Sequence, residues 1–246
     1  MGIVLKNIDC LELLKSLPDY SVDLMLTDPP YGTTHIEWDN HINLAEMWLE
    51  WERVVKPNGA FVFTACQPFT SNLIISRLGF FKYELIWEKG KATQHANCNI
   101  RPLKAHENIV VFYRQQPTYN PQKEKGEPYK GRNVKNRTEA WSNYSNVKGN
   151  DNDGFRFPRS VIYFKSGDRD GALHPTQKPI DLFRYLIRTY SNPGETVFDG
   201  YSGSGTTAIA CIKENRNFIG CELNKEYYDK SMERISIALS KPELFT

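Results

Sequence analysis

The sequence predicts an α/β fold, in which helices cover both faces of a doubly wound, mostly parallel sheet. Three observations predict this fold. Short apolar runs alternate with segments whose apolar residues recur at helical spacing. Late in the chain, a glycine-rich turn joins an apolar run to an apolar helix. Between residues 115 and 159 aliphatic side chains nearly vanish, so that stretch cannot build a core and is expected to be an insertion.

The expected elements follow from these local signals. Pro18, the Lys-Pro-Asn-Gly segment 56–59 and Gly79 end three helical patterns, and Pro179 begins a fourth. The expected strands are residues 3–6, 22–28, 60–65, 80–87, 108–113, 196–199 and 217–222, and the chain is expected to recover order at residues 160–164. The expected helices are residues 10–17, 44–55, 69–78, 180–190 and 208–212.

Bulk composition narrows the class of protein. A chain of 246 residues with 40% hydrophobic residues can bury one sizeable core. A net charge of +2 does not by itself indicate a nucleic-acid partner. Its five cysteines are an odd number and widely spaced, which is typical of reduced thiols in the cytoplasm. No metal-ligand spacing and no membrane-spanning run occurs, so we expect no metal site and no membrane association.

The segment Asp28-Pro29-Pro30-Tyr31 follows the second expected strand and is the most informative motif. Two prolines in succession stiffen the turn and leave backbone carbonyls without a ladder partner. A carboxylate, outward carbonyls and an aromatic ring at a strand's carboxyl end can hold a planar amine. An ordinary stop between a strand and a loop is the alternative reading of the tetrapeptide alone.

A second motif predicts a nucleoside site. The strand ending at Asp199 runs into Gly200-Tyr201-Ser202-Gly203-Ser204-Gly205-Thr206, where glycines permit positive φ and close approach of a ligand. The next strand ends in Glu222, and a carboxylate at that edge can accept both hydroxyls of a ribose. No lysine stands directly before Thr206, as it would in the phosphate-binding loop of a nucleotide hydrolase. A nucleoside ligand without a triphosphate therefore fits better. A tight turn with a surface acid is the alternative.

Two further segments complete the set of candidate sites. Thr176, Gln177 and Lys178 stand at a helix N-terminus, where a ligand carboxylate is stabilised, although a plain helix cap would also explain them. The insertion carries nine basic and five acidic residues interleaved with aromatic rings, which suits phosphate and base contacts; a solvated loop is the alternative. Its candidate DNA-binding residues are Lys130, Arg132, Lys135, Arg137, Lys148 and Arg156.

Together these motifs resemble the amino-group DNA methyltransferases that use S-adenosyl-L-methionine. Asp28 to Tyr31 resembles their catalytic motif, residues 174–179 the segment before the cofactor motif, and Asp199 to Gly205 the cofactor motif itself. Having the catalytic motif first, a variable region next and the cofactor motif last resembles the permuted β-class. The resemblance implies a Rossmann-like methyltransferase sheet with a catalytic half at residues 1–114, an inserted target-recognition region at 115–165 and a cofactor-binding half at 166–246. Where the family commonly has Asp-Pro-Phe, this chain has Asp199-Gly200-Tyr201.

The resemblance also implies roles for individual residues. Asp28 and the Pro29 carbonyl would accept the two amino hydrogens of the target base, and Tyr31 would stack on the base after it is flipped out of the duplex. Asp9 would accept from the adenine of the cofactor and Glu222 would hold its ribose. The residues expected around the cofactor are Asp9, Asp28, Thr176, Gln177, Lys178, Asp199, Tyr201, Ser202, Gly203, Ser204, Gly205, Thr206 and Glu222.

Aspartate in the first position of the tetrapeptide resembles enzymes that act on adenine, and cytosine remains the alternative target. An RNA methyltransferase and a DNA-binding protein that has lost catalysis are the two rival readings. The long basic insertion favours duplex DNA over RNA, and the intact set Asp28, Tyr31, Gly203, Gly205 and Glu222 argues against lost catalysis. The expected partner is double-stranded DNA, and the resemblance leaves open a homodimer and a separate cognate restriction endonuclease. It places the protein in the cytoplasm of a bacterium, encoded by the cell or by a phage. It further requires that folding bring the catalytic and cofactor motifs side by side.

Overall fold

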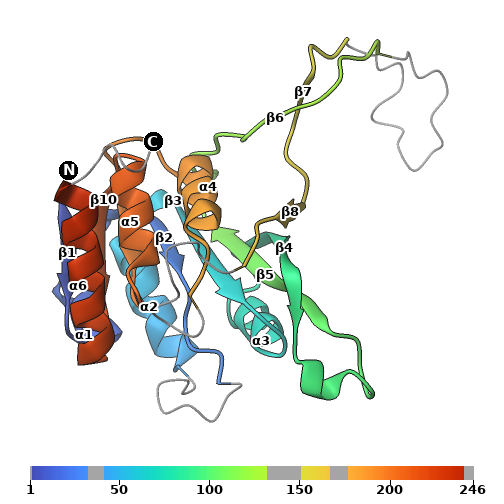
Figure 1. Ribbon diagram of the computed structural model, residues 1–246. Helices are drawn as coiled ribbons and strands as arrows, with labels where there is room; N and C mark the ends of the chain where they lie inside the picture. The colour runs from blue at the N-terminus through green and yellow to red at the C-terminus, as the bar shows by residue number, and fades with distance from the viewer. Residues whose placement is uncertain (1, 33–41, 132–150, 167–176, 241–246) are drawn as a thin grey trace. The chain divides into compact units, whose positions relative to one another are not determined.

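The computed structural model describes residues 2–32, 42–131, 151–166 and 177–240 (Figure 1). The chain divides into two compact units. Unit 1 comprises Met1–Asn120 and Ser160–Thr246, and unit 2 comprises Pro121–Arg159. In unit 2, the short strands β6 (Glu124–Lys125) and β7 (Phe155–Arg156) pair antiparallel, and an isolated bridge joins Tyr129 to Asn152. No helix in the described ranges is long and apolar enough to cross a membrane.

Unit 1 is built on an eight-stranded sheet in the order β1-β10-β9-β2-β3-β5-β4-β8. Strand β5 is antiparallel to both of its neighbours, and the other pairings are parallel. This confirms the expected α/β class with a mostly parallel sheet. In that order, the strands span Ile3–Lys6, Asn217–Cys221, Thr196–Asp199, Val22–Thr27, Val55–Ala65, Lys104–Tyr113, Phe81–Thr93 and Val161–Tyr163.

Helices cover both faces of this sheet, because successive strand residues point to opposite faces. On β2, Val22 and Met25 pack with α1 (Cys10–Ser16), α2 (Leu44–Val54) and α3 (Phe69–Ser76). Leu24 and Leu26 belong to the core of the opposite face. The helices of that face are α4 (Ile180–Tyr190), α5 (Thr206–Lys213) and α6 (Lys225–Ser240).

The element boundaries differ from the expected ones in three informative places. Strand β3 begins at Val55, directly after α2, because the 56–59 segment forms an irregularity in the pairing with β2. A Cβ on Gly59 would lie 2.6 Å from a Val55 methyl, so only glycine fits there. Strands β4 and β5 extend well beyond the expected ends toward each other. Helix α6 was not expected, since only three of its residues are buried.

The strand order places a topological switch point between β9 and β2. From β9 the chain continues through α5 to β10 on one side, whereas from β2 it continues through α2 to β3 on the other. The carboxyl ends of β9 and β2 are therefore neighbours, and crossovers leave them in opposite directions. In open parallel sheets a ligand crevice forms at such a point.

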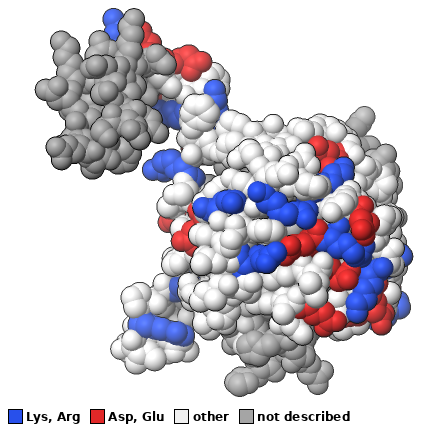
Figure 2. All heavy atoms as spheres, turned by 180° about the vertical axis from the view of Figure 1, so that it is seen from behind, with Lys and Arg blue, Asp and Glu red and all other residues white. Residues whose placement is uncertain are grey.

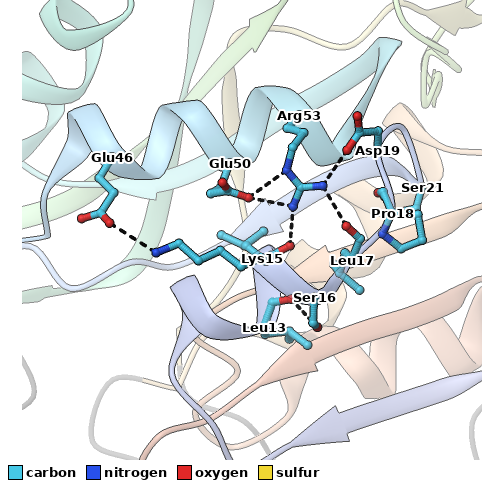
Figure 3. A network of polar contacts seen from close by, with 11 residues as sticks. Leu13, Lys15, Ser16, Leu17, Pro18, Asp19, Ser21, Glu46, Glu50 and Arg53 are labelled. Carbon is cyan, nitrogen blue, oxygen red and sulfur yellow. Dashed lines mark hydrogen bonds and ion pairs between the residues drawn. The ribbon is translucent and has the colours of Figure 1, made fainter.

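Arg53 of α2 ties the end of α1 and the turn that leads into β2 to α2, as Figure 3 shows. Its guanidinium donates to the backbone carbonyls of Leu14 (2.7 Å) and Leu17 (2.8 Å) at the end of α1. The Leu14 carbonyl also accepts from the Leu17 N–H at 3.0 Å. It also pairs with Asp19 and Glu50, each at 2.7 Å. These bonds fix the end of α1 and the turn into β2, and the two carboxylates raise the pKa of Arg53.

We expect Arg53→Met to lower the free energy of unfolding by about 1–2 kcal/mol, because two helix-end carbonyls lose a charged donor in a partly buried site. Urea denaturation measures this change. Lys15→Met is the matched control, since it removes an exposed ion pair with Glu46 in the same network and should cost at most about 0.5 kcal/mol. Equal losses in the two variants would contradict the role assigned to Arg53.

Candidate active site

A cavity of about 290 Å³ opens at the carboxyl ends of β1, β10, β9 and β2. Five segments that are far apart in the sequence line it, which is what the switch point predicts. Its lining comprises Ile8, Asp9, Cys10, Asp28, Pro30, Ile42, Gln177, Lys178, Phe183, Asp199, Gly200, Tyr201, Ser202, Gly203, Ser204, Thr206, Thr207, Glu222, Leu223 and Tyr227. The tetrapeptide and the glycine-rich turn thus face one cavity.

The glycine-rich turn is held against Glu222. Gly203 and Gly205 have φ values of 52° and 78°, a region that side chains disfavour. The backbone N–H of Gly203 donates to one carboxylate oxygen of Glu222 at 2.8 Å, and the N–H of Asn224 donates to the other at 2.8 Å. Burial raises the pKa of Glu222 despite these bonds. The Leu223 backbone bonds this carboxylate too, so of its roughly four lone-pair sites about one remains for a ligand hydroxyl.

Asp199 joins the two motif-bearing strands. Its buried carboxylate accepts hydrogen bonds from the Thr27 hydroxyl of β2 (2.7 Å), the Thr207 hydroxyl (2.5 Å) and the Tyr201 N–H (3.0 Å). Burial raises the pKa of Asp199 to about 6, and the three donors partly offset this effect. Asp199 therefore fixes the turn after β9 relative to the end of β2.

Three side chains hold the carboxylate of Asp28. Its Oδ1 accepts from the Tyr31 hydroxyl at 2.5 Å and from the Thr64 hydroxyl, and its Oδ2 accepts from the Lys178 ammonium at 2.5 Å. The ring of Tyr31 stacks on Phe69 with centroids 5.5 Å apart. Burial, followed by the charge of Asp28, raises the pKa of Tyr31, so its phenol remains a donor.

Asp28 begins a row of alternating charges that crosses four neighbouring strands. Lys178 also lies 3.6 Å from Glu107 of β5, and Glu107 pairs with Lys89 of β4 at 2.5 Å. The side chains of Lys178 and Lys89 are only 8% and 9% exposed, so each ammonium depends on the carboxylates around it. Burial lowers the pKa of Lys178, but Asp28 and Glu107 outweigh that effect and raise it overall.

The expected cofactor residues that the structure describes all lie around the cavity except Gly205, the N-cap residue directly before α5. Asp9 caps α1, because its Oδ1 accepts from the N–H groups of Leu11 and Glu12. Gln177 accepts from the Ser204 hydroxyl at 3.1 Å. Lys178, expected near a ligand carboxylate, instead pairs with Asp28 in this structure. Thr176 lies outside the described residues.

The proposed DNA contacts fall mostly outside the described part of the chain, which omits Arg132, Lys135, Arg137 and Lys148. In unit 2, Lys130 is exposed, and the guanidinium of Arg156 lies 5.7 Å from the centroid of the Tyr129 ring. Among the described residues, no group of three or more His, Cys, Asp or Glu side chains could hold a metal ion.

Several site residues were not expected from the sequence. The Thr27 hydroxyl donates to Asp199, and the Thr64 hydroxyl donates to Asp28. Glu107 and Lys89 extend the row of charges. Tyr227 of α6 lines the cavity. Thr27 directly precedes the tetrapeptide, so its position could have marked it. Lys89 and Glu107 lie in segments 87–89 and 106–114, which resemble the later catalytic-half strands of amino-group DNA methyltransferases, but their ion pairs were not expected. Nothing in the sequence near Thr64 or Tyr227 relates them to Asp28 or the glycine-rich turn.

Comparison with known proteins decides the family. Residues 22–233 match the family described as DNA methylase, which is most of the chain. The chain belongs to this family. This confirms the resemblance to amino-group DNA methyltransferases that the motifs indicate.

Among curated relatives, the family member "Type II methyltransferase M.HpaI" of Haemophilus parainfluenzae is 30% identical over 239 residues, which are 92% of this chain and 72% of that protein. The "DNA adenine methyltransferase YhdJ" of Escherichia coli (strain K12) is 30% identical over 252 residues, which are 94% of this chain and 81% of that protein. A solved structure described as the M1.HpyAVI-SAM complex is 27% identical with a TM-score of 0.68, and the likeness covers 95% of this chain and 98% of that one.

The raised pKa of Asp199 predicts a pH dependence of stability. A folded-state pKa of about 6, above its ordinary value of 3.8, means that the folded state binds this proton more tightly than the unfolded state. The resulting stabilisation is complete below about pH 4 and is lost as the pH rises through 6. We expect the stability of Asp199→Asn relative to wild type to increase by a few kcal/mol between pH 4 and 7.

Urea unfolding across this pH range measures the difference. Glu233→Gln, which changes an exposed carboxylate on α6, is the control and should show a small, nearly flat difference. A difference for Asp199→Asn that stays constant with pH would contradict the raised pKa.

Proposed function

We propose that this methylase transfers a methyl group from S-adenosyl-L-methionine to the exocyclic amino group of adenine in double-stranded DNA. The observation that carries the proposal is the carboxylate of Asp28 at the wall of the switch-point cavity, fixed by three donors. Two further points support adenine as the target. The tetrapeptide begins with aspartate, and the E. coli relative is named as an adenine methyltransferase.

The residues around the cavity fit S-adenosyl-L-methionine, which supplies an electrophilic methyl group on a sulfonium when bound. Glu222 presents partly buried carboxylate oxygens that can accept a ribose hydroxyl. Ile8, Leu223 and Tyr227 offer apolar surface for a planar base, and Gly203 leaves open space above the turn. Gln177 and Ser204 are the polar groups of the cavity suited to a zwitterionic amino-acid end. The named relative in complex with SAM supports this assignment.

Asp28 acts in this proposal as a fixed acceptor. A carboxylate offers about four lone-pair sites, and Tyr31, Thr64 and Lys178 occupy three of them. The remaining site on Oδ2 can accept one hydrogen of the target amino group, and the Pro29 carbonyl can accept the other. Holding both hydrogens favours pyramidal nitrogen and exposes its lone pair for attack on the methyl carbon. As the nitrogen–carbon bond formed, the carbon–sulfur bond would break, S-adenosyl-L-homocysteine would leave, and the surplus amino proton would pass by way of Asp28 to water.

Lys178 links the charge of Asp28 to that of Glu107. Its ammonium lies 2.5 Å from Asp28 and 3.6 Å from Glu107, so a small shift toward Glu107 would free more of Oδ2 for the substrate. Tyr31 keeps its hydroxyl on Asp28 and one ring face on Phe69. We assign to its ring the contact with a base that has been flipped out of the duplex.

The catalytic prediction concerns Asp28. We expect Asp28→Ala to lower kcat by about 100- to 1,000-fold, because the amino group loses its fixed acceptor, while affinity for S-adenosyl-L-methionine changes little. Tritium transfer to DNA and titration calorimetry measure the two quantities. Asp229→Ala, an exposed aspartate on α6, is the control. Full activity of Asp28→Ala would refute the assignment.

The cofactor prediction concerns Glu222. We expect Glu222→Gln to weaken binding of S-adenosyl-L-methionine by about 1–3 kcal/mol, or roughly fivefold to 150-fold, because an amide accepts fewer hydroxyl hydrogen bonds than a carboxylate. Titration calorimetry measures the affinity. The control Glu226→Gln changes an exposed acid on α6 and should bind as wild type does. Unchanged binding by Glu222→Gln would place the ribose elsewhere.

Sequencing of modified bases tests the target. Genomic DNA from cells that express the wild-type chain should carry N6-methyladenine within one short sequence, and DNA from cells that express Asp28→Ala should lack it. N4-methylcytosine at that sequence would overturn the choice of base. Methylated RNA with unmodified DNA would overturn the choice of nucleic acid.

A further inference from the structure

The hairpin that extends β4 and β5 is a second feature of the sheet edge that bears Asp28. We call residues 90–106, which follow Lys89 and precede Glu107, the β4–β5 arm. It belongs to unit 1, the same compact unit as Asp28. Figure 1 shows it projecting from the sheet as the green hairpin with one helical turn at its end. The residues that line the switch-point cavity are not part of it.

The arm is a formed structure. Thr93 pairs with Lys104 in the strand ladder, and the Thr93 hydroxyl donates to the Lys104 carbonyl at 3.2 Å. The tip is a 3-10 turn, His95–Asn97, preceded by Gln94 in the left-handed region with a φ of 66°. Backbone bonds close the tip, including those from the N–H groups of Ile100 and Arg101 to the Asn97 carbonyl, each at 3.0 Å. The tip therefore presents a preformed surface.

The surface of the arm is positively charged. It carries Lys91, Arg101 and Lys104 and no aspartate or glutamate, although the whole chain has a net charge of only +2. No ion pair with a described carboxylate engages these three cations. In Figure 2 the projection at lower left shows blue and white spheres without red. Ile100, which directly precedes Arg101 in the chain, is 81% exposed, an unusual position for a large apolar side chain.

The base of the arm is tied to Asp28. Strands β2, β3 and β4 end at one edge of the sheet, and the antiparallel β5 begins there. Lys89 and Glu107, which border the arm, form the row of charges with Lys178 and Asp28. The arm thus starts at the edge where the proposed target base would lie, and buried ion pairs fix its base.

We propose that the β4–β5 arm contacts duplex DNA beside the target base, with Lys91, Arg101 and Lys104 on backbone phosphates and Ile100 against the sugars or base edges. The inference rests on the proposed function, because it takes DNA as the substrate. An arm that carries three cations, no acidic residue and an exposed apolar side chain matches a surface that neutralises phosphates and places an apolar group in a groove. An acidic protein partner would match the cations but not the proximity to Asp28.

The first experiment measures the salt dependence of binding to a random-sequence duplex. Each phosphate contact contributes about 0.9 to the slope of log K against log salt concentration, so Lys91→Gln with Arg101→Gln should lower the slope by about 1.8. The matched control, Lys225→Gln with Lys230→Gln, removes the same charge from α6 and should leave the slope unchanged. An unchanged slope in the arm variant would overturn the proposal.

The second experiment uses two apolar positions and a native thiol. Ile100→Glu should weaken duplex binding, whereas Ile237→Glu on α6, the control, should not. Cys98 is the exposed one of the five cysteines and lies in the arm, so it reports on the wild-type protein directly. Bound duplex should slow its reaction with a thiol reagent severalfold, and high salt should restore the rate. An unprotected Cys98 on saturating duplex would overturn the proposal.

These measurements distinguish failure of the arm proposal from failure of the proposed function. A wild-type chain that methylates DNA, with an arm variant that keeps the wild-type salt slope, would refute the arm alone. A chain that binds DNA through the arm but transfers no methyl group would refute the proposed function and leave the arm assignment standing.

Discussion

The parallel pairing of β2 with β9 is the constraint on which the rest of the site depends. It places the end of the Asp28 strand beside the end of the Asp199 strand, although 171 residues separate them in the sequence. The bond from the Thr27 hydroxyl to Asp199 locks this arrangement directly below the cavity. Since the crossovers leave these two strands in opposite directions, a crevice opens at their ends, and both motifs face it.

The charged side chains of the site lie at the same edge of the sheet, where β2 ends. Asp28, Lys178, Glu107 and Lys89 form two carboxylates and two ammonium groups in alternation, so the row is neutral as a whole. Burying charge is unfavourable unless each group has an opposite partner, and removing one member would leave an unpaired buried charge. The row therefore holds the Asp28 carboxylate in place through side chains of β4 and β5. On the other side of the cavity, Asp199 holds the glycine-rich turn that follows β9.

The sequence predicted what local patterns encode. Strand 196–199 and helix 180–190 have the observed bounds, since an apolar run before a glycine turn and a helical apolar face after Pro179 are local signals. The β4–β5 arm was missed because residues 88–107 show no apolar alternation, and α6 was missed because most of its surface is polar. The row of charges was also missed, since ion pairs between strands depend on sheet order, which local patterns do not specify.

The most direct test of the account is a crystal structure of the protein with sinefungin, a stable analogue of S-adenosyl-L-methionine. The account predicts that the ribose of the analogue lies on Glu222, its amino-acid end lies beside Gln177 and Ser204, and the amine that replaces the methyl group points toward Asp28. Ligand density outside the switch-point cavity, or with that amine directed away from Asp28, would contradict the central claim.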